Sequence, residues 1–124
     1  MNNNHECLIC LGSNKDADIH LKVAQNALMH LFQKVAFGNR VITKAEGPIL
    51  QPDYVNLAAR IVTSVSCDEV KKSLKQIEID NGRTPEDKQM GSVPLDIDLL
   101  TYDSEVLRPE DLEKNYVKQA LKSL

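Results

Sequence analysis

The sequence predicts an α+β fold in which helices cover one face of an antiparallel sheet. Short apolar runs with strand character, at residues 7–11, 54–63 and 95–102, alternate with stretches of helical periodicity. Each helical stretch carries a single apolar stripe, so each helix needs a sheet face to cover. The 124 residues, of which 42% are hydrophobic, are enough for one domain with its own core, and we expect residues 1–124 to form it.

The first half of the chain is expected to supply a strand, a helix and a second strand. Residues 7–11 form the first apolar run, and Gly12, Ser13 and Asn14 end it. Apolar residues then recur at helical spacing: Leu21, Ala24, Leu28, Leu31 and Phe32. Residues 35–43 have weak strand character. Residues 45–53 contain Gly47, Pro48 and Pro52, which predict a loop.

The strongest strand signal lies at residues 54–63, where apolar and polar positions alternate. One face of this strand is predicted to carry Val55, Leu57, Ala59 and Ile61, and the other face Tyr54, Asn56, Ala58 and Arg60. A second helix follows, because Ser66 and Glu69 form a capping box. Its inner stripe is Val70, Leu74 and Ile77, and Asn81-Gly82 ends it.

The rest of the chain completes a known arrangement of elements. Residues 83–93 are predicted to form a mobile polar loop, and residues 95–102 a strand. Pro109 suits the first turn of a last helix, whose apolar side is Leu112, Tyr116, Ala120 and Leu124. The order is therefore β-α-β-β-α-β plus a C-terminal helix, which is the ferredoxin-like antiparallel sheet with helices on one face. This fold hosts many activities and identifies none of them.

Charge and hydropathy exclude several classes of function. The formal net charge is -3, and acidic and basic residues are mixed without a basic stripe, so a nucleic-acid partner is not expected. No apolar run approaches the length of a membrane span. Residues 1–6 are polar and lack the pattern of a secretory signal, so we expect a cytoplasmic protein. Composition leaves the oligomeric state open, and we expect a monomer or a weak homo-oligomer.

The chain contains three cysteines, of which Cys7 and Cys10 form a C-x-x-C pair. This spacing can indicate a redox or metal site. Both residues are predicted to lie in one strand, where residues three apart point to opposite faces. No second pair completes a zinc set. Small buried core residues are therefore the preferred interpretation.

Asp96 and Asp98 carry the sharpest chemical signal in the sequence. Alternate residues of a strand share a face, so both carboxylates point the same way and repel each other unless a cation compensates. Hard oxygen ligands at this spacing suit Mg²⁺, which takes one or two carboxylates and completes its shell with phosphates and water. The alternative is a solvated strand face, or ion pairs with lysine or arginine.

Three weaker signals accompany this pair. Tyr54 and Asn56 share a strand face, where a ring could stack on a flat heterocycle and an amide could bond its edge. An exposed tyrosine on a polar face is the plainer explanation. The turn at residues 12–14 could bind phosphate or simply cap a helix. Glu78 and Arg83 could meet a ribose and a phosphate, or lie on a solvated helix end.

Taken together, these segments resemble the 6-hydroxymethyl-7,8-dihydropterin pyrophosphokinase family. The matching stretches follow the family's order, and the resemblance spans about residues 7 to 108. They are Leu11-Gly12-Ser13-Asn14, Gly47-Pro48, Gln51-Pro52-Asp53-Tyr54-Val55-Asn56, Ile77-Glu78, Gly82-Arg83 and Leu95-Asp96-Ile97-Asp98. The Pro-Asp-Tyr-x-Asn and Leu-Asp-x-Asp elements are specific when they occur together.

The resemblance implies transfer of a pyrophosphoryl group from ATP to a dihydropterin, with AMP as the other product, in folate biosynthesis. It implies that Asp96 and Asp98 bind two Mg²⁺ ions and, with Arg83, form the catalytic set. The pterin site would include Thr43, Tyr54, Asn56 and Met90. The nucleotide would meet Glu78, Arg83 and Lys88. ATP and a dihydropterin are thus the expected partners.

This sequence departs from the family pattern in the loop before the aspartate pair. Pro85, Gln89 and Val93 stand where cations are usual, and Met90 stands where the family carries a pterin-sandwiching tryptophan. Lys44-Ala45 replaces a Pro-Pro pair. Arg108-Pro109 leads directly to the last helix instead of a Pro-His-containing stretch.

These departures leave three interpretations open: an active but slow pyrophosphokinase, a non-catalytic module that binds a pterin, a nucleotide or a protein, and an unrelated ferredoxin-like domain. If the scaffold is otherwise competent, Val93→Arg with Met90→Trp should raise turnover.

Overall fold

The computed structural model describes residues 4–44 and 51–124. Most of the loop predicted at residues 45–53 lies outside these residues. The strands are β1 His5–Ser13, β2 Lys34–Phe37, β3 Val41–Thr43, β4 Tyr54–Thr63, β5 Asp96–Tyr102 and β6 Glu105–Val106. The helices are α1 Ala17–Leu31, α2 Cys67–Asp80, α3 Asp87–Met90, α4 Pro109–Leu112 and α5 Asn115–Lys122.

The strands form one antiparallel sheet in the order β2-β4-β1-β5-β6, with β3 paired to β4 beyond β2. The central strand β1 pairs with β4 on one side and with β5 on the other. The strand that follows α1 therefore lies outside the strand that precedes α2, which is the ferredoxin-like order. The predicted fold class is confirmed.

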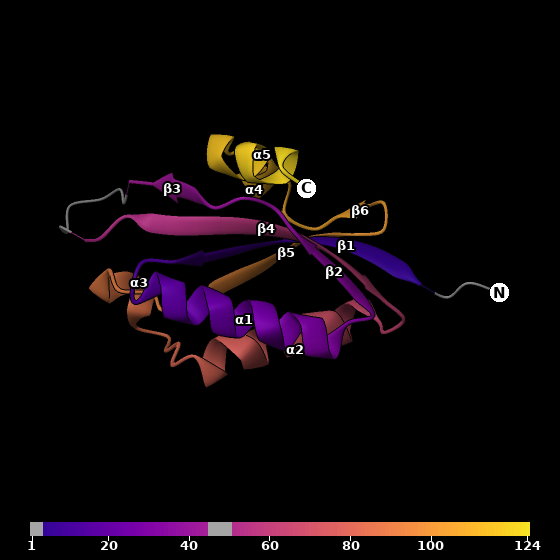
Figure 1. The fold of residues 1–124 in the computed structure, drawn as a ribbon, viewed down its shortest axis with the longest axis horizontal. Helices are drawn as coiled ribbons and strands as arrows, with labels where there is room; N and C mark the ends of the chain where they lie inside the picture. The colour runs from indigo at the N-terminus through magenta and orange to yellow at the C-terminus, as the bar shows by residue number, and fades with distance from the viewer. Residues whose placement is uncertain (1–3, 45–50) are drawn as a thin grey trace.

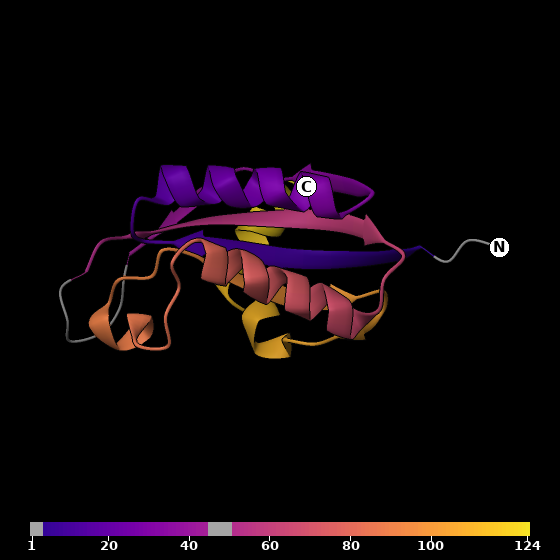
Figure 2. The same ribbon diagram turned by 90° about the horizontal axis from the view of Figure 1, so that it is seen from below.

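Helices lie on both faces of this sheet. α1 and α2 run side by side beneath it, and α4 and α5 lie across the opposite face (Figures 1 and 2). The larger core, which includes Ile9, Leu28 and Leu74, fills the layer between the sheet and the first helix pair. A smaller cluster of Cys10, Leu100 and Val117 lies under α5. The C-terminal helix thus covers only part of the second face, and the rest stays open.

The strand faces follow the predicted parity. Leu57, Ala59 and Ile61 of β4 belong to the core between the sheet and the helices α1 and α2, as do Ile97 and Leu99 of β5. Their alternate neighbours point to the opposite face. The predicted boundaries of α2 also hold, because Ser66 Oγ accepts from the Glu69 N–H at 3.2 Å and Gly82 follows the helix with φ +87°. Cys7 and Cys10 lie in different hydrophobic clusters, as the strand interpretation requires.

The strand predicted at residues 35–43 is divided into β2 and β3. Phe37 pairs with Ala59 and Val41 pairs with Asn56, so this strand advances four residues while β4 advances three. A side chain at Gly38 would lie 2.4 Å from Ser123 Oγ and 2.9 Å from the Ala120 carbonyl oxygen. The close approach of α5 therefore requires glycine at the break.

The predicted last helix is also divided. Lys114 adopts an extended conformation between α4 and α5. Buried Asp111 bonds Arg108 on one side and Lys114 on the other, which fixes this break. Within the predicted polar loop at 83–93, residues 87–90 form the single turn α3, and Gly91 ends it with φ +72°.

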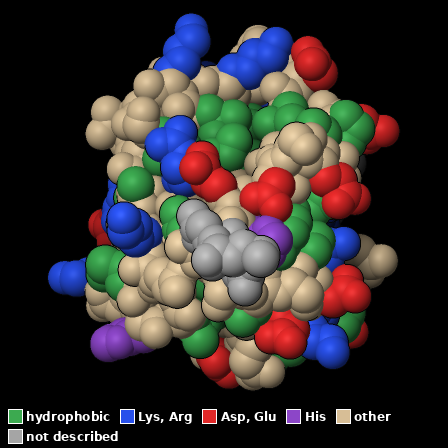
Figure 3. Space-filling view, turned by 90° about the vertical axis from the view of Figure 1, so that its right-hand side faces the viewer, with side chains coloured by type: hydrophobic (Ala, Val, Ile, Leu, Met, Phe, Trp, Pro, Cys, Tyr) green, Lys and Arg blue, Asp and Glu red, His purple; other side chains and the backbone are tan. Residues whose placement is uncertain are grey.

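Among the described residues, the face of the molecule at the N-terminal end carries no large patch of a single charge. Acidic and basic side chains are interspersed there (Figure 3). Among the helices of the described part of the chain, none combines the length and the apolar character needed to cross a bilayer.

Candidate active site

Two rows of residues cross the open face of the sheet from β4 over β1 to β5. The pairing places Gly12 between Asn56 and Asp96, and Cys10 between Ala58 and Asp98. Adjacent strands lie about 4.8 Å apart, so an amide on β4 and a carboxylate on β5 are separated by roughly 10 Å across Gly12. A flat molecule can lie over this gap and touch both edges.

A cavity of about 790 Å³ opens over these rows. Its volume falls within the usual range of small-molecule sites. Six predicted site residues line it: Thr43, Tyr54, Asn56, Lys88, Asp96 and Asp98. The sequence thus anticipated most of one wall, although the roles of these residues remain predictions.

The Asn56 side chain has a fixed orientation at the cavity floor. Its Nδ2 donates to the Val41 carbonyl at 3.1 Å and to Thr43 Oγ1 at 3.0 Å. Oδ1 faces β1, because a methyl group at Gly12 would lie 3.2 Å from it. Both donors of the amide are used within the protein, so its oxygen is the group that can accept a bond from a ligand.

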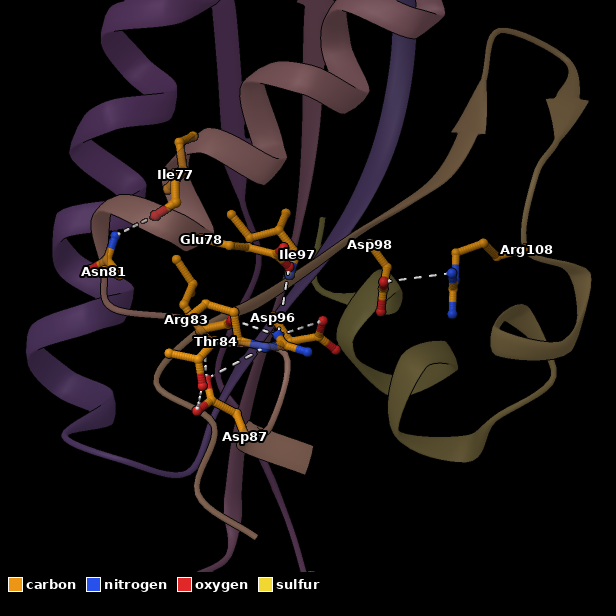
Figure 4. A network of polar contacts seen from close by, with 11 residues as sticks. Ile77, Glu78, Asn81, Arg83, Thr84, Asp87, Asp96, Ile97, Asp98 and Arg108 are labelled. Carbon is orange, nitrogen blue, oxygen red and sulfur yellow. Dashed lines mark hydrogen bonds and ion pairs between the residues drawn. The ribbon is translucent and has the colours of Figure 1, made fainter. Parts of the chain in front are cut away.

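Asp96 is held by Arg83, which lies at the start of the loop after α2. Arg83 Nη1 is 3.2 Å from Asp96 Oδ1 and donates to the Leu95 carbonyl at 2.9 Å (Figure 4). The same guanidinium lies within 3.8 Å of Glu78 and 3.6 Å of Asp87. In this structure Arg83 is the centre of a carboxylate network, with 18% of its side chain exposed.

Glu78 lies behind β5, outside the large cavity. Its carboxylate accepts from the Ile97 N–H at 2.7 Å, on the edge of β5 that faces away from β1 (Figure 4). Burial raises the pKa of Glu78 above its ordinary value, although this bond opposes the shift. A second hollow of about 320 Å³ opens here, and Lys71, Lys75 and Arg108 bring positive charge to it. Asp96 and Asp98 border both hollows.

Asp98 faces Arg108, which is not among the site residues predicted from the sequence. Arg108 Nη1 lies 3.7 Å from Asp98 Oδ1 (Figure 4). Burial, and then the neighbouring Asp96 carboxylate, raise the pKa of Asp98 to about 6, while Arg108 and Lys88 act in the opposite direction. Arg108 and Lys88 therefore offset only part of the effect that burial and Asp96 have on the Asp98 carboxylate.

Met90 and Val93, two positions where the sequence departs from the family pattern, do not line the cavity. Met90 is 73% exposed on α3 and is absent from the cavity lining, so its assignment to the pterin site is not supported. The single turn of α3 ends at Gly91, and this leaves Met90 on the surface. Val93 is 1% exposed, so an arginine introduced there would be buried. This burial counts against the expectation that Val93→Arg with Met90→Trp raises turnover, which stays a prediction.

Sequence reasoning missed the wall that the C-terminal segment supplies. Lys114, Asn115 and Tyr116 line the cavity from the start of α5. The apolar spacing of Leu112, Tyr116, Ala120 and Leu124 indicated only a helix that covers core, and nothing local shows where that helix docks.

The turn at residues 12–14 leads to an aspartate at the start of α1, one of the two predicted cap types, but this aspartate makes no capping bond. Asp16 is the N-cap residue of α1, with φ 47° and no side-chain capping bond. Asn14 instead is buried and bonds other segments.

The fold and this cavity define a ferredoxin-like domain with paired carboxylates, a tyrosine and an amide on the open sheet face. A family model described as 7,8-dihydro-6-hydroxymethylpterin-pyrophosphokinase (HPPK) matches residues 8–124. Over 107 residues the chain is 35% identical to 2-amino-4-hydroxy-6-hydroxymethyldihydropteridine pyrophosphokinase of Haemophilus influenzae. That match covers 84% of this chain and 66% of the relative, just under two thirds of its length. The chain belongs to the HPPK family.

Proposed function

We propose that this chain transfers pyrophosphate from ATP to 6-hydroxymethyl-7,8-dihydropterin, a step of folate biosynthesis. The observation that carries the proposal is the shared cavity of Asp96 and Asp98 with Tyr54 and Asn56. The two carboxylates suit a cation that binds phosphates, and the tyrosine and the amide suit a flat heterocycle. We further expect the chain to act in the cytoplasm as a monomer or a weak homo-oligomer, without nucleic acid.

The pterin would lie over Gly12, between the amide of Asn56 and the carboxylates of β5. Tyr54 offers a ring for stacking, and Asn56 Oδ1 offers an acceptor for an N–H on the edge of the heterocycle. Gly12 has no side chain, so the ring can approach the backbone closely. Thr43 supports this site indirectly because it fixes the Asn56 amide.

The carboxylate pair fits Mg²⁺, and the family resemblance calls for two ions. Within residues 4–44 and 51–124 no cluster of three His, Cys, Asp or Glu is placed to hold a metal. Two carboxylates are nevertheless the usual protein contribution to Mg²⁺ when phosphates complete the shell. Burial, and then Asp96, raise the pKa of Asp98, and this supports the proposal because a bound cation would stabilise the ionised carboxylate. When bound, Mg²⁺ would neutralise charge on the triphosphate.

The triphosphate would cross the aspartate pair between the two hollows. Lys88 borders the cavity, and Lys71, Lys75 and Arg108 border the smaller hollow behind β5. In the reaction, the hydroxymethyl oxygen of the pterin forms a bond to the β-phosphorus while the bond from that phosphorus to AMP breaks. The protein contributes mainly position and positive charge to such a step.

A non-catalytic binding role is the second candidate, and one observation favours it. Arg83 is engaged by Asp96, Glu78, Asp87 and the Leu95 carbonyl, so its guanidinium is not poised toward the cavity. A site with few available cations can hold a Mg²⁺-nucleotide yet stabilise the transition state poorly.

Calorimetry and product analysis together test the proposal. A non-hydrolysable ATP analogue should bind in the presence of Mg²⁺ and far more weakly without it, and the pterin substrate with ATP should yield AMP. Asp96→Asn with Asp98→Asn should abolish the Mg²⁺ dependence. Asp103→Asn is the matched control, because Asp103 bonds His5 and the Glu6 N–H away from the cavity. Absence of pterin and nucleotide binding at millimolar concentration would overturn the proposal.

A further inference from the structure

Asn14 joins three segments that are far apart in the sequence. Its backbone N–H donates to the Val93 carbonyl at 3.0 Å, and its Oδ1 accepts from the Val93 N–H at 2.6 Å. Its Nδ2 donates to the Gly91 carbonyl at 3.0 Å and reaches the Pro52 carbonyl at 3.5 Å. One side chain thus connects the end of β1, the segment before β4 and the end of the loop before β5.

Both segments bonded by the Asn14 amide carry cavity residues. Gln51 precedes Pro52, and Lys88 lies one turn before Gly91; each lines the large cavity. The two segments also touch each other, because a methyl group at Gly91 would lie 2.8 Å from Gln51 Oε1 and 3.3 Å from Gln51 Cβ. The amide therefore lies where two walls of the cavity meet.

The local sequence explains why a side chain is needed here. The pairing of β1 with β5 ends at Gly12 and Asp96, and Pro94 has no N–H to extend the ladder. The Asn14 oxygen takes the Val93 N–H instead. Asn14 is 5% exposed and Val93 is 1% exposed, so water does not compete for these bonds.

We propose that Asn14 is a positioning residue, which holds the Gln51 and Lys88 segments in register over the cavity. It touches no substrate and acts through the backbone of Gly91 and Pro52. The consequence for ligand binding rests on the proposed function, whereas the coupling of the two segments does not. A free loop must be ordered when a ligand binds, and a loop that is already fixed avoids that loss.

Two substitutions separate the two halves of the Asn14 side chain. Asn14→Ala removes all side-chain bonds. Asn14→Asp keeps an acceptor for the Val93 N–H but replaces the donor that faces the Gly91 and Pro52 carbonyls with negative charge. If coupling is the role of Asn14, both variants should show faster amide hydrogen exchange in residues 51–54 and 84–91, while only Asn14→Ala loses protection at Val93.

Ligand affinity is the second measurement. Both variants should bind the Mg²⁺ complex of a non-hydrolysable ATP analogue about tenfold more weakly, the loss expected when one or two hydrogen bonds no longer pre-order the site. Tyr102→Phe is the control for lost stability, because it removes the bond from Tyr102 Oη to the Val65 carbonyl at 2.8 Å, away from the cavity. It should lower the melting temperature and leave the affinity unchanged.

Each result has one meaning for the inference. Faster exchange in both segments with weaker binding in both variants supports it. Affinity equal to wild type in Asn14→Asp would overturn it, because anchoring of Val93 would then suffice. Unchanged exchange in residues 51–54 and 84–91 would overturn it whatever the ligand data. If the wild-type chain binds no nucleotide, the proposed function and the binding half of the inference fail together, and the exchange data still decide the coupling.

Discussion

Asp98 lies with its carboxylate 3.7 Å from the guanidinium of Arg108, an arginine that arrives from the segment between β6 and α4. The two residues are ten positions apart and meet because β5 and β6 form a short hairpin that returns the chain toward the cavity. The arginine only partly offsets the repulsion from Asp96, since burial and Asp96 still raise the pKa of Asp98 to about 6.

Removal of the half-buried Asp98 charge should stabilise the free protein. At neutral pH, Asp98 is ionised beside Asp96 at a cost in folding free energy, so we expect Asp98→Asn to raise the melting temperature by about 2–5 °C without Mg²⁺. The same variant should lose Mg²⁺-dependent nucleotide binding, a trade between stability and function. Calorimetric melting with and without the metal checks both effects. A lower melting temperature than wild type would show that the Arg108 pair outweighs the repulsion.

Local patterns predicted the sheet and its open face well. Strand parity placed Tyr54, Asn56, Asp96 and Asp98 on one side because side-chain direction in a strand depends only on odd or even position. The capping box at Ser66 and the glycine stop at Gly82 are equally local, and both hold.

Features that depend on tertiary approach were beyond prediction. The break at Gly38 exists because α5 comes within contact of the strand there. The cation at Asp98 comes from a hairpin return, and the Asn14 bonds join segments separated by up to 79 residues. The spacing of apolar residues along the chain carries no information about such long-range contacts. Met90 was assigned from its alignment with a tryptophan, yet the geometry of α3 leaves it exposed.

Stability should fall in acid through Asp111. Burial alone would raise the pKa of Asp111, but hydrogen bonds from Arg108 and Lys114 outweigh it and hold the pKa below its ordinary value. A carboxylate with a depressed folded-state pKa stabilises the protein above its unfolded pKa of about 3.9, and this contribution is lost as pH falls through the folded value. We expect Asp111→Asn to cost roughly 1–2 kcal/mol at pH 7.

The difference between wild type and Asp111→Asn should shrink below about pH 4 and vanish once the wild-type carboxyl is protonated. Urea unfolding of both proteins across pH 2.5–7 measures it. A difference that stays constant through this window would mean that the residue acts through packing and not through its charge.

Gly12→Ala should separate binding from stability at the cavity floor. The new methyl group would lie 3.2 Å from Asn56 Oδ1 and 3.8 Å from Tyr54 Cδ1, so it would occupy the space assigned to the pterin ring. Alanine suits a strand interior better than glycine by roughly 0.5 kcal/mol, but the tight contact with the fixed Asn56 amide opposes this gain, so the melting temperature should change little. Titration with a pterin should show at least about tenfold weaker binding. Unchanged affinity would place the ring elsewhere in the cavity.

Replacement of Met90 and Val93 by the residues usual in the family should have very different effects on the free energy of unfolding. Val93 is 1% exposed and its N–H bonds Asn14, so Val93→Arg would bury a guanidinium without a prepared partner and should cost about 3 kcal/mol or more in folding free energy. Met90 is 73% exposed, so Met90→Trp should change stability by less than about 0.5 kcal/mol. Urea unfolding of each single variant measures these costs directly.

If Met90→Trp strengthens pterin binding while it leaves stability unchanged, α3 must move toward the cavity when the ligand is present. If Val93→Arg is tolerated without loss of stability, the bonds of Asn14 to the loop must be able to rearrange, and the rigid junction described above would be wrong.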